Sequence, residues 1–371
     1  MTDSAHRPDR QRSGRALCLS GGGFRAALFH AGALRRLNEA GLLAQLTTIS
    51  SVSGGSIASG LLARLWPTFR FDAAGVVRSF GGYEAALREV CAHDLRTGPL
   101  LLGRLNPLNW PALWSGRRSA TDLLARAYDE RLTHGLKLGD LPTHGEPGRP
   151  RFVFCASNLQ TGVSFELSGG RVGDYLLGYA RAPELPVALA VAASSAFPVA
   201  FPPLVLALDP ERFTGGRLPD RDLRRRLARR VVLSDGGVYD NMGLEPVWKT
   251  HRTVLVSDGG KPFAPRAAQR TWLVPRLLRV QDVIGNQALA LRRRWLVASL
   301  ERGEYDGAYW GLGTEIGSYP EHGPGFTGPA LTRIREVRTD LDAFRDGEQR
   351  VLLDHGWALA DAPSGPTASR C

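Results

Sequence analysis

Residues 49–56, ISSVSGGS, constrain the fold of this chain more than any other segment. The segment begins with the β-branched composition of a strand, and residues 57–65 have the composition of a helix. Between them stands Ser53, with the small residues Ser51 and Gly55 two positions away on either side. A strand that turns this sharply into a helix holds its serine clear of the sheet. Ser53 is therefore a candidate nucleophile, although such turns also serve as plain connections.

A strand, a glycine loop and a helix precede this segment. Residues 15–20 predict a buried strand, Gly21, Gly22 and Gly23 form the loop, and residues 26–40 are apolar at helical spacing. Two successive strand–helix units predict an α/β fold with a mainly parallel central sheet. The loop also fits the dinucleotide pattern G-x-G-x-x-A. The next strand lacks the acidic residue which that fold needs, so nucleotide binding is disfavoured.

The remaining chain predicts one large domain. We expect a disordered tail over residues 1–14, an α/β domain over 15–360 and a C-terminal tail over 361–371. Residues 66–150 predict a mostly helical insertion, with helices over 83–93 and 121–132. Its aromatic stretch 106–114 is either core or a lipid-facing lid. Further strands are expected at 151–157, 163–167, 230–234, 253–257 and 308–312, and late helices at 332–345 and 348–359.

Two apolar stretches bear on membranes. Residues 185–208 carry no charge and are long enough to span a bilayer, but four prolines favour a buried helix, turn and strand instead. Residues 265–300 predict a long basic helix. We expect its apolar face to pack on the protein and its basic face to be solvated, with docking on a membrane surface as the alternative.

Composition limits the partners. The net charge is +11, and all but three of the 47 basic residues are arginine. No RNA- or DNA-reading motif accompanies this charge, so nucleic acid is not expected. The cysteines, at positions 18, 91, 155 and 371, have neither zinc-site spacing nor the pattern of a disulfide framework. The first 15 residues lack an apolar signal segment, which predicts a cytoplasmic protein. We expect no metal and no cofactor.

A serine nucleophile needs a base and donors for an oxyanion. No histidine follows a strand in a glycine-rich setting, and His30 lies inside the first predicted helix. Asp235 follows the strand-like run VVLS and precedes two glycines. Asp258 follows the next strand in the same way, so this pattern alone does not choose between the two aspartates. The glycine loop at 21–23 can direct backbone amides at an anion.

Four ordered blocks make the sequence similar to the patatin-like phospholipases. They are SGGGFR at 20–25, SVSGG at 51–55, ASSAFP at 193–198 with FPP at 201–203, and DGGVYDNMG at 235–243. The resemblance extends from residue 16 to about residue 260, apart from most of the insertion. It implies a three-layer α/β/α fold, a Ser–Asp dyad without histidine, and hydrolysis of fatty-acyl esters in phospholipids, lysophospholipids or neutral lipids.

The resemblance also assigns residues. It implies that Ser53 is the nucleophile, that Asp235 is the base, and that the oxyanion hole is formed by Gly21, Gly22 and Gly23. The supporting residues that it implies are Arg25, Gly55, Gly236, Gly237 and Asn241. Arg25 would order the glycine loop or meet a phosphate, and Asn241 would fix the turn after Asp235. Asp258 lies outside the matching block, which makes it structural.

Two positions depart from the family pattern. Ser51 stands where the elbow usually has a glycine, and Ala26 stands where a glycine often follows the arginine. Both side chains are small, so we expect the geometry to survive. Two other functions stay open. One is a non-catalytic lipid-binding module on the same fold, and the other is an acyltransferase, although such sites normally use a histidine. Peripheral contact with a membrane fits each of them.

Overall fold

The computed structural model describes residues 12–98, 119–198, 200–265, 272–319 and 322–362. The aromatic stretch 106–114 lies outside these residues, as do residues 1–11 and 363–371 of the two expected tails. Residues 361 and 362 are described, and Asp361 is the last residue of a helix rather than part of a tail.

Within the described residues the strands form one sheet, ordered β10-β9-β1-β2-β3-β4-β5-β6, with β8 between β3 and β7. The first five of these strands run parallel, and the pairs from β3 onward are antiparallel. The predicted parallel core is therefore extended by an antiparallel edge. The strands are β1 Arg15–Leu19, β2 Thr48–Val52, β3 Arg151–Asn158, β4 Val163–Ser168, β5 Val172–Asp174, β6 Gly178–Ala180, β7 Leu204–Leu206, β8 Val231–Asp235, β9 Thr253–Asp258 and β10 Asp306–Gly311.

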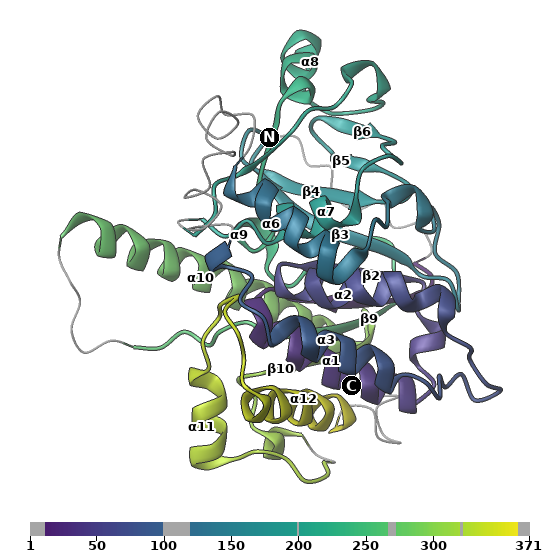
Figure 1. Ribbon diagram of the computed structural model, residues 1–371, viewed down its shortest axis with the longest axis vertical. Coiled ribbons are helices and arrows are strands. Elements are labelled where there is room, and N and C mark those ends of the chain that lie inside the picture. Colours follow the sequence, from purple (N-terminus) through teal and green to yellow (C-terminus); the bar gives the residue numbers. More distant parts are fainter. Residues whose placement is uncertain (1–11, 99–118, 199, 266–271, 320–321, 363–371) are drawn as a thin grey trace.

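Helices cover both faces of the sheet (Figure 1). The α-helices are α1 Gly23–Glu39, α2 Gly54–Leu65, α3 Gly81–Cys91, α6 Ala120–Tyr128, α7 Val187–Ser194, α8 Arg221–Arg229, α9 Gly237–Asp240, α10 Leu273–Glu301, α11 Gly328–Glu336 and α12 Asp346–Asp361. Shorter helical turns lie at Leu43–Gln45, Trp66–Thr68, Asp129–Thr133, Leu138–Asp140, Pro210–Arg212 and Ile316–Ser318.

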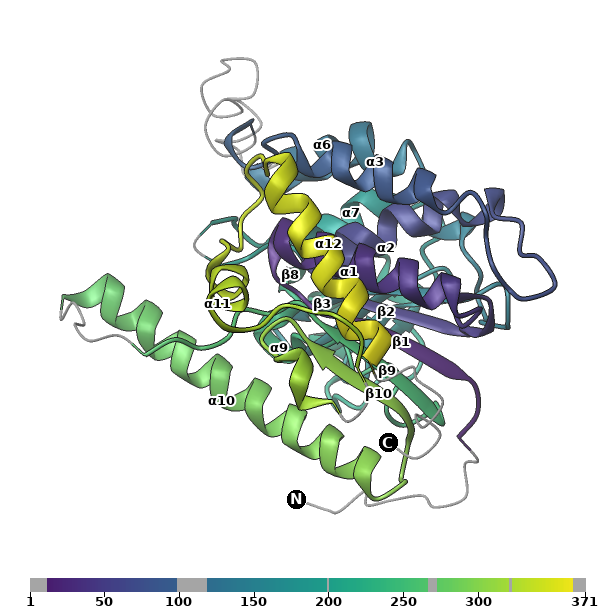
Figure 2. The ribbon, with the colours of Figure 1, turned by 90° about the horizontal axis from the view of Figure 1, so that it is seen from below.

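Strand β1 shows how the layers arise. Successive side chains of a strand point to opposite faces, so β1 divides its apolar residues between two cores. Leu17 and Leu19 join the large core that includes α1, α2 and α12, whereas Ala16 and Cys18 join a smaller core with Leu296 of α10. Figure 2 shows α10 on the opposite side of the sheet from α1 and α12. The fold is thus the expected three-layer α/β/α arrangement.

The expected insertion contributes to the larger core. Helix α3 packs against α1 and α2, and α6 packs against α7. Tyr83 of α3 is buried and donates its hydroxyl proton to the carbonyl oxygen of Ala58 in α2. Leu124 and Tyr128 of α6 are fully buried. Burial of a large apolar side chain contributes about 1.5–3 kcal/mol. These two helices are therefore part of the helical layer.

The prediction of one helix over residues 332–345 is wrong. Helix α11 ends at Glu336, and the chain turns extended at Val337. The segment after it is held by contacts with the first turn of α1, because Arg25 donates to the Val337 carbonyl and Phe24 N–H donates to the Asp340 carbonyl. Tertiary hydrogen bonds thus overrule the helical pattern, and they bring this segment to the sheet edge where β1 ends.

The two stretches that were weighed as membrane segments, residues 185–208 and 265–300, differ in how far their apolar side chains are buried. Residues 185–208 form α7, a turn and β7, as predicted, with α7 largely buried. Across the described ranges, no helix is both long enough and apolar enough to span a bilayer. Helix α10 is the long basic helix expected over 265–300. Its apolar side chains do not all pack on the protein, however, and many between Trp272 and Leu291 are exposed. The expectation of a packed apolar face is wrong for that part.

Candidate active site

Strand register brings Ser53 beside Asp235. One edge of β3 is occupied by β4 along its length from Val153 to Asn158. On the other edge β2 pairs as far as Val52 opposite Cys155, and β8 then pairs antiparallel, with Asp235 opposite Ala156. Strands β2 and β8 therefore meet end to end along β3. The residue after Val52 is Ser53, so its side chain lies next to Asp235.

Ser53 has the backbone of a nucleophile elbow. Its φ of 50° and ψ of −115° lie in a region that favours glycine, and helix α2 begins at the next residue. The Ser53 amide donates to the Ser194 hydroxyl oxygen at 2.9 Å, and Ser194 donates to the Cys155 carbonyl at 2.6 Å. Ser56 of α2 lies 2.9 Å from the same Ser194 oxygen. Ser194 thus ties the strained turn to α2 and β3.

Asp235 is buried next to the Ser53 side chain. Only 3% of its surface is exposed, and burial raises the pKa of its carboxyl from 3.8 to about 6. The Gly237 amide, which donates to this carboxyl at 2.7 Å, and the nearby Ser53 side chain both oppose that rise in pKa. The carboxylate is therefore ionised at neutral pH but is a better proton acceptor than an exposed aspartate.

The glycine loop lies against the serine. Gly22 and Gly23 have φ values of 144° and 59°, which favour glycine. A Cβ added to Gly54 would lie 2.8 Å from the Gly23 nitrogen, and one added to Gly21 would lie 3.1 Å from the Ser53 Cβ. A side chain at any of these positions would separate the loop from the serine. The loop and the elbow therefore fit together only without Cβ atoms.

The amides of this loop differ in their availability. Gly21 N–H donates to the Asn241 carbonyl at 3.0 Å, so the expectation that all three loop glycines face an anion is wrong for Gly21. Gly22 N–H precedes α1, and Gly23 and Gly54 N–H begin α1 and α2, where no carbonyl lies one turn back. These three amides donate to no other group in the described part of the chain. Two helix N-termini therefore direct unpaired amides toward Ser53.

The supporting residues hold the loops rather than line an open site. Arg25 is fully buried and donates to the carbonyls of Gly259 and Val337, both at 2.9 Å. Its guanidinium thus binds the backbone after β9 and after α11, and its two expected roles, ordering the glycine loop or meeting a phosphate, stay predictions. Burial lowers its pKa to about 10.

Asn241 and the neighbouring glycines make the close contacts that the site needs. The Asn241 side chain fills the space that a Cβ on Gly21 or Gly237 would occupy, at 2.4 and 2.6 Å from its Oδ1. A Cβ on Gly55 would lie 2.3 Å from the Leu19 carbonyl oxygen, and one on Gly236 would lie 2.3 Å from the Cys155 carbonyl oxygen. Small residues are therefore required where β1, β2, β3 and β8 end.

Asp258 and His30 lie apart from the serine. Asp258 accepts from the Tyr309 hydroxyl at 2.9 Å and from the Gly260 amide at 3.0 Å, which agrees with a structural role. His30 is fully buried, and burial lowers its pKa to about 4. Its Nε2 is 2.9 Å from the Ser20 carbonyl oxygen and its Nδ1 is 2.8 Å from the Ser257 hydroxyl. A carbonyl only accepts, so Nε2 carries the proton of this neutral ring.

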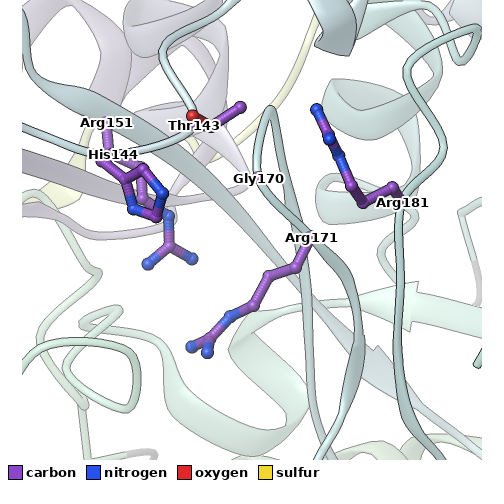
Figure 3. Close-up of a pocket in the computed structure, with 6 residues that line it drawn as sticks. All are labelled: Thr143, His144, Arg151, Gly170, Arg171 and Arg181. Atoms are coloured by element: carbon purple, nitrogen blue, oxygen red, sulfur yellow. The ribbon is translucent and has the colours of Figure 1, made fainter. Parts of the chain in front are cut away.

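A separate cavity of about 270 Å³ lies near the opposite end of β3 (Figure 3). It is lined by Thr143, His144, Arg151, Gly170, Arg171 and Arg181. Arg151 and Arg171 both pair with Glu166, at 2.8 and 2.9 Å, and Figure 3 shows the Arg181 side chain pointing away from that of Arg171. Arg151 begins β3, whereas Asp235 lies beside its other end. This cavity is therefore not part of the Ser53 site.

Comparison with known families agrees with this geometry. The model of the family described as "Patatin-like phospholipase" matches residues 17–248, which include Ser53, Asp235 and the glycine loop. The chain belongs to the patatin-like phospholipase family. A comparison with curated protein sequences gives no match.

Solved structures show the same fold. Human GIVD cytosolic phospholipase A2 superposes with a TM-score of 0.55 at 14% identity, over 98% of this chain and 60% of that one. The same human protein in complex with methyl gamma-linolenyl fluorophosphonate and terbium chloride gives 0.52 at 15% identity, over 98% and 59%. The patatin-like chain thus spans about 60% of the length of these structures, and the likeness concerns the fold.

Two departures from the patatin-like pattern fit the structure. The Ser51 hydroxyl is buried and donates to the Val153 carbonyl at 3.3 Å, so the extra oxygen has a partner. The Ala26 methyl group lies in the gap left by Gly22 and Gly259, whose added Cβ atoms would be 3.1 and 2.7 Å away. Both replacements are accommodated without moving the loop.

Sequence reasoning missed two contributors to this patatin-like site. Ser194 lies inside the ASSAFP block, and its contact with the Ser53 amide depends on α7 ending beside β2. The Gly54 amide was overlooked because the helix was expected to begin at Ile57, whereas it begins directly after the serine. A rule that places the helix start immediately after an elbow serine identifies this amide.

Proposed function

We propose that this protein is a serine-dependent lipid acyl hydrolase that cleaves fatty-acyl esters through a Ser53–Asp235 dyad. The observation that carries the proposal is the Ser53 side chain lying next to the buried Asp235 carboxyl, whose pKa it lowers, beside three amides that donate to no other group in the described residues. Family membership supports the reaction class. The substrate would be a phospholipid, a lysophospholipid or another acyl ester, and the enzyme would be cytoplasmic and act at a membrane surface.

In the first step Ser53 Oγ attacks the ester carbonyl carbon while its proton passes to the Asp235 carboxylate. The carbonyl π-electrons move to oxygen, and Gly22, Gly23 and Gly54 N–H stabilise the oxyanion. The tetrahedral intermediate then collapses and Asp235 returns the proton to the leaving alcohol oxygen. The product of this step is an acyl-Ser53 ester and a free alcohol or lysolipid.

In the second step Asp235 takes a proton from water as the water oxygen attacks the acyl-serine carbonyl. Collapse releases the fatty acid, and the proton returns to Ser53 Oγ. A single carboxylate serves both steps because its elevated pKa, about 6, lies near the working pH. Ser53 is 8% exposed, so the reacting atoms are almost surrounded by protein, which strengthens the electrostatic stabilisation.

The dyad also bears on the alternatives. A non-catalytic lipid-binding module has no use for a strained serine placed next to a buried carboxylate. An acyltransferase would use the same first step and differ in the acceptor. His30 and His355 are both buried. Both ring nitrogens of His30, and Nε2 of His355, contact backbone carbonyls or Ser257 rather than Ser53. Transfer to an alcohol therefore stays a second candidate that acceptor competition can measure.

The test is hydrolysis of a panel of phospholipids, lysophospholipids and neutral acyl esters by wild type and Ser53→Ala. We expect fatty-acid release by wild type and its loss, by about 10³-fold or more, in the variant, with an unchanged circular dichroism spectrum. Asp258→Asn, a matched buried aspartate with the same following glycines, is the control and should retain activity. Full activity of Ser53→Ala would refute the proposal.

A further inference from the structure

The N-terminal two-thirds of α10 exposes an unusual amount of apolar surface. This 29-residue helix leaves the body of the protein at its N-terminal end (Figure 2). Ile284 is 64% exposed and Trp272, which precedes the helix, is 59% exposed. The exposed large apolar residues here are Trp272, Leu273, Leu277, Leu278, Val280, Val283, Ile284 and Leu291. Monomeric proteins seldom leave such a continuous row uncovered, which marks it as an interaction surface.

Five of the exposed residues form a stripe along one face of the helix. Leu273, Leu277, Val280, Ile284 and Leu291 follow one another at spacings of three, four or seven, and Ala288 continues the row. Leu296 and Leu300, which pack on the sheet, belong to the other side of the helix. Leu277, Ile284 and Leu291 recur every seven residues, or about two helical turns, so they lie on the same face of the helix.

Arginines accompany the stripe. The helix carries Arg276, Arg279 and the run 292–294, against Asp282 and Glu301. Arg276 and Arg294 are exposed. Long guanidinium side chains beside an apolar face can lie along that face and place their charge at lipid phosphates. The charge of this surface is therefore complementary to an anionic one.

The stripe is connected to the Ser53 site. Arg292 of α10 pairs with Asp240 at 3.5 Å and stacks on Tyr239, both in α9, the helix that follows Asp235. On the same α9, Val238 is 50% exposed, and Phe197, beside the residue whose carbonyl accepts the Asp235 amide, is 58% exposed. Exposed apolar residues thus lie close to Asp235 and Ser194 in the sequence, at Val238 and Phe197, as well as along α10.

We propose that α10 is the element that docks this enzyme on an anionic lipid bilayer, with its stripe in the interface and its arginines at the headgroups. This rests on the proposed function, since it supplies the surface from which Ser53 draws its substrate. A second copy of the chain is the other occupant that such a stripe could have. It would place the same arginine-rich helix opposite itself, so like charges would face each other across the contact. An anionic bilayer removes that repulsion.

Vesicle sedimentation tests the docking surface without turnover. All proteins carry Ser53→Ala, so the lipid stays intact, and the vesicles are phosphatidylcholine alone or mixed with phosphatidylglycerol. We expect preferential binding to the anionic vesicles. Leu277→Gln with Ile284→Gln should lower the partition coefficient about tenfold or more, and Arg276→Gln with Arg294→Gln should lower it about tenfold on anionic vesicles only. Equal binding by all variants would overturn the proposal.

Helix α12 supplies the matched control. Val351→Gln with Arg350→Gln removes one exposed apolar and one exposed cationic residue there, and we expect the partition coefficient to change by less than about twofold. Sedimentation velocity without lipid tests whether the stripe binds a second copy of the chain instead. A wild-type dimer that dissociates in Leu277→Gln/Ile284→Gln would mean that the stripe binds a second copy, and the proposal would be wrong.

A second measurement avoids dependence on the folding of the double variants. Cys18, Cys91 and Cys155 are buried, so Ala288→Cys in a Cys371→Ser background can be labelled with an environment-sensitive dye. We expect a blue shift with anionic vesicles and none with neutral ones. No shift with anionic vesicles would overturn the proposal. Hydrolysis of a soluble short-chain ester by the stripe variants with Ser53 intact should be unchanged. Loss of ester hydrolysis in Ser53→Ala therefore tests the chemistry, and vesicle binding tests the docking.

Discussion

Replacing Asp235 by Asn should stabilise the protein while abolishing its activity. Burial raises the pKa of this carboxyl from 3.8 to about 6 in the folded protein. The folded state therefore holds the proton more tightly than the unfolded state does, and the stability of wild type falls as the pH rises from about 4 to about 6. A difference of about two units between the pKa values of the folded and unfolded states lowers the free energy of unfolding by about 3 kcal/mol at pH 7 and above. Asparagine carries no charge, so the variant does not lose stability as the pH rises.

Urea denaturation of both proteins between pH 5 and pH 8 measures the effect. The free energy of unfolding of Asp235→Asn should exceed that of wild type by an amount that grows up to about pH 6.5 and then levels off, at up to about 3 kcal/mol. Asp258→Asn is the control and should be less stable than wild type, because an NH₂ group replaces one of the two carboxylate oxygens that accept hydrogen bonds from Gly260 N–H and the Tyr309 hydroxyl. Equal or lower stability of Asp235→Asn throughout this range would refute the reasoning.

Three other predictions concern the same site. Ser53→Gly should be about 1 kcal/mol more stable than Ser53→Ala in thermal denaturation, because glycine accepts the φ of 50° without strain; equal stability would mean that the elbow stores no strain. Ser194→Ala should cost about 1–3 kcal/mol of stability, since the Ser53 amide and the Cys155 carbonyl lose their partner. It should also lower kcat more than it raises KM for a soluble ester. An unchanged kcat would show that the Ser194 hydrogen bonds are not needed for catalysis. The kcat/KM for that ester should fall tenfold per pH unit below about pH 6 as Asp235 takes up a proton, and a profile flat to pH 4.5 would exclude Asp235 as the base.

Much of the fold could be predicted because its elements are local and strongly patterned. The strand, glycine loop and helix at residues 15–40 and the elbow at 49–65 appear where the pattern predicts them. The helix over 332–345 failed for a tertiary reason, since Arg25 and Phe24 bind the backbone of Val337 and Asp340. No local pattern contains those contacts between residues more than 300 positions apart.

The same distinction applies to the site. The pairing of Ser53 with Asp235 follows from β8 continuing the line of β2 along β3, and no spacing in the sequence encodes that junction. Asp235 and Asp258 look alike locally and only the longer family block distinguishes them in the sequence; in the structure one carboxyl lies next to Ser53 and the other accepts from Tyr309. The exposure of α10 could not be predicted either, because amphipathic spacing does not say whether an apolar face is covered.

Covalent labelling tests the central claim most directly. An alkyl fluorophosphonate reacts with an activated serine, so incubation followed by intact-mass measurement and peptide mapping reports which hydroxyl is nucleophilic. We predict one adduct per chain, located on Ser53, absent in Ser53→Ala and formed at least about 100-fold more slowly in Asp235→Asn. No adduct on the wild type, or an adduct on another residue that persists in Ser53→Ala, would contradict the account.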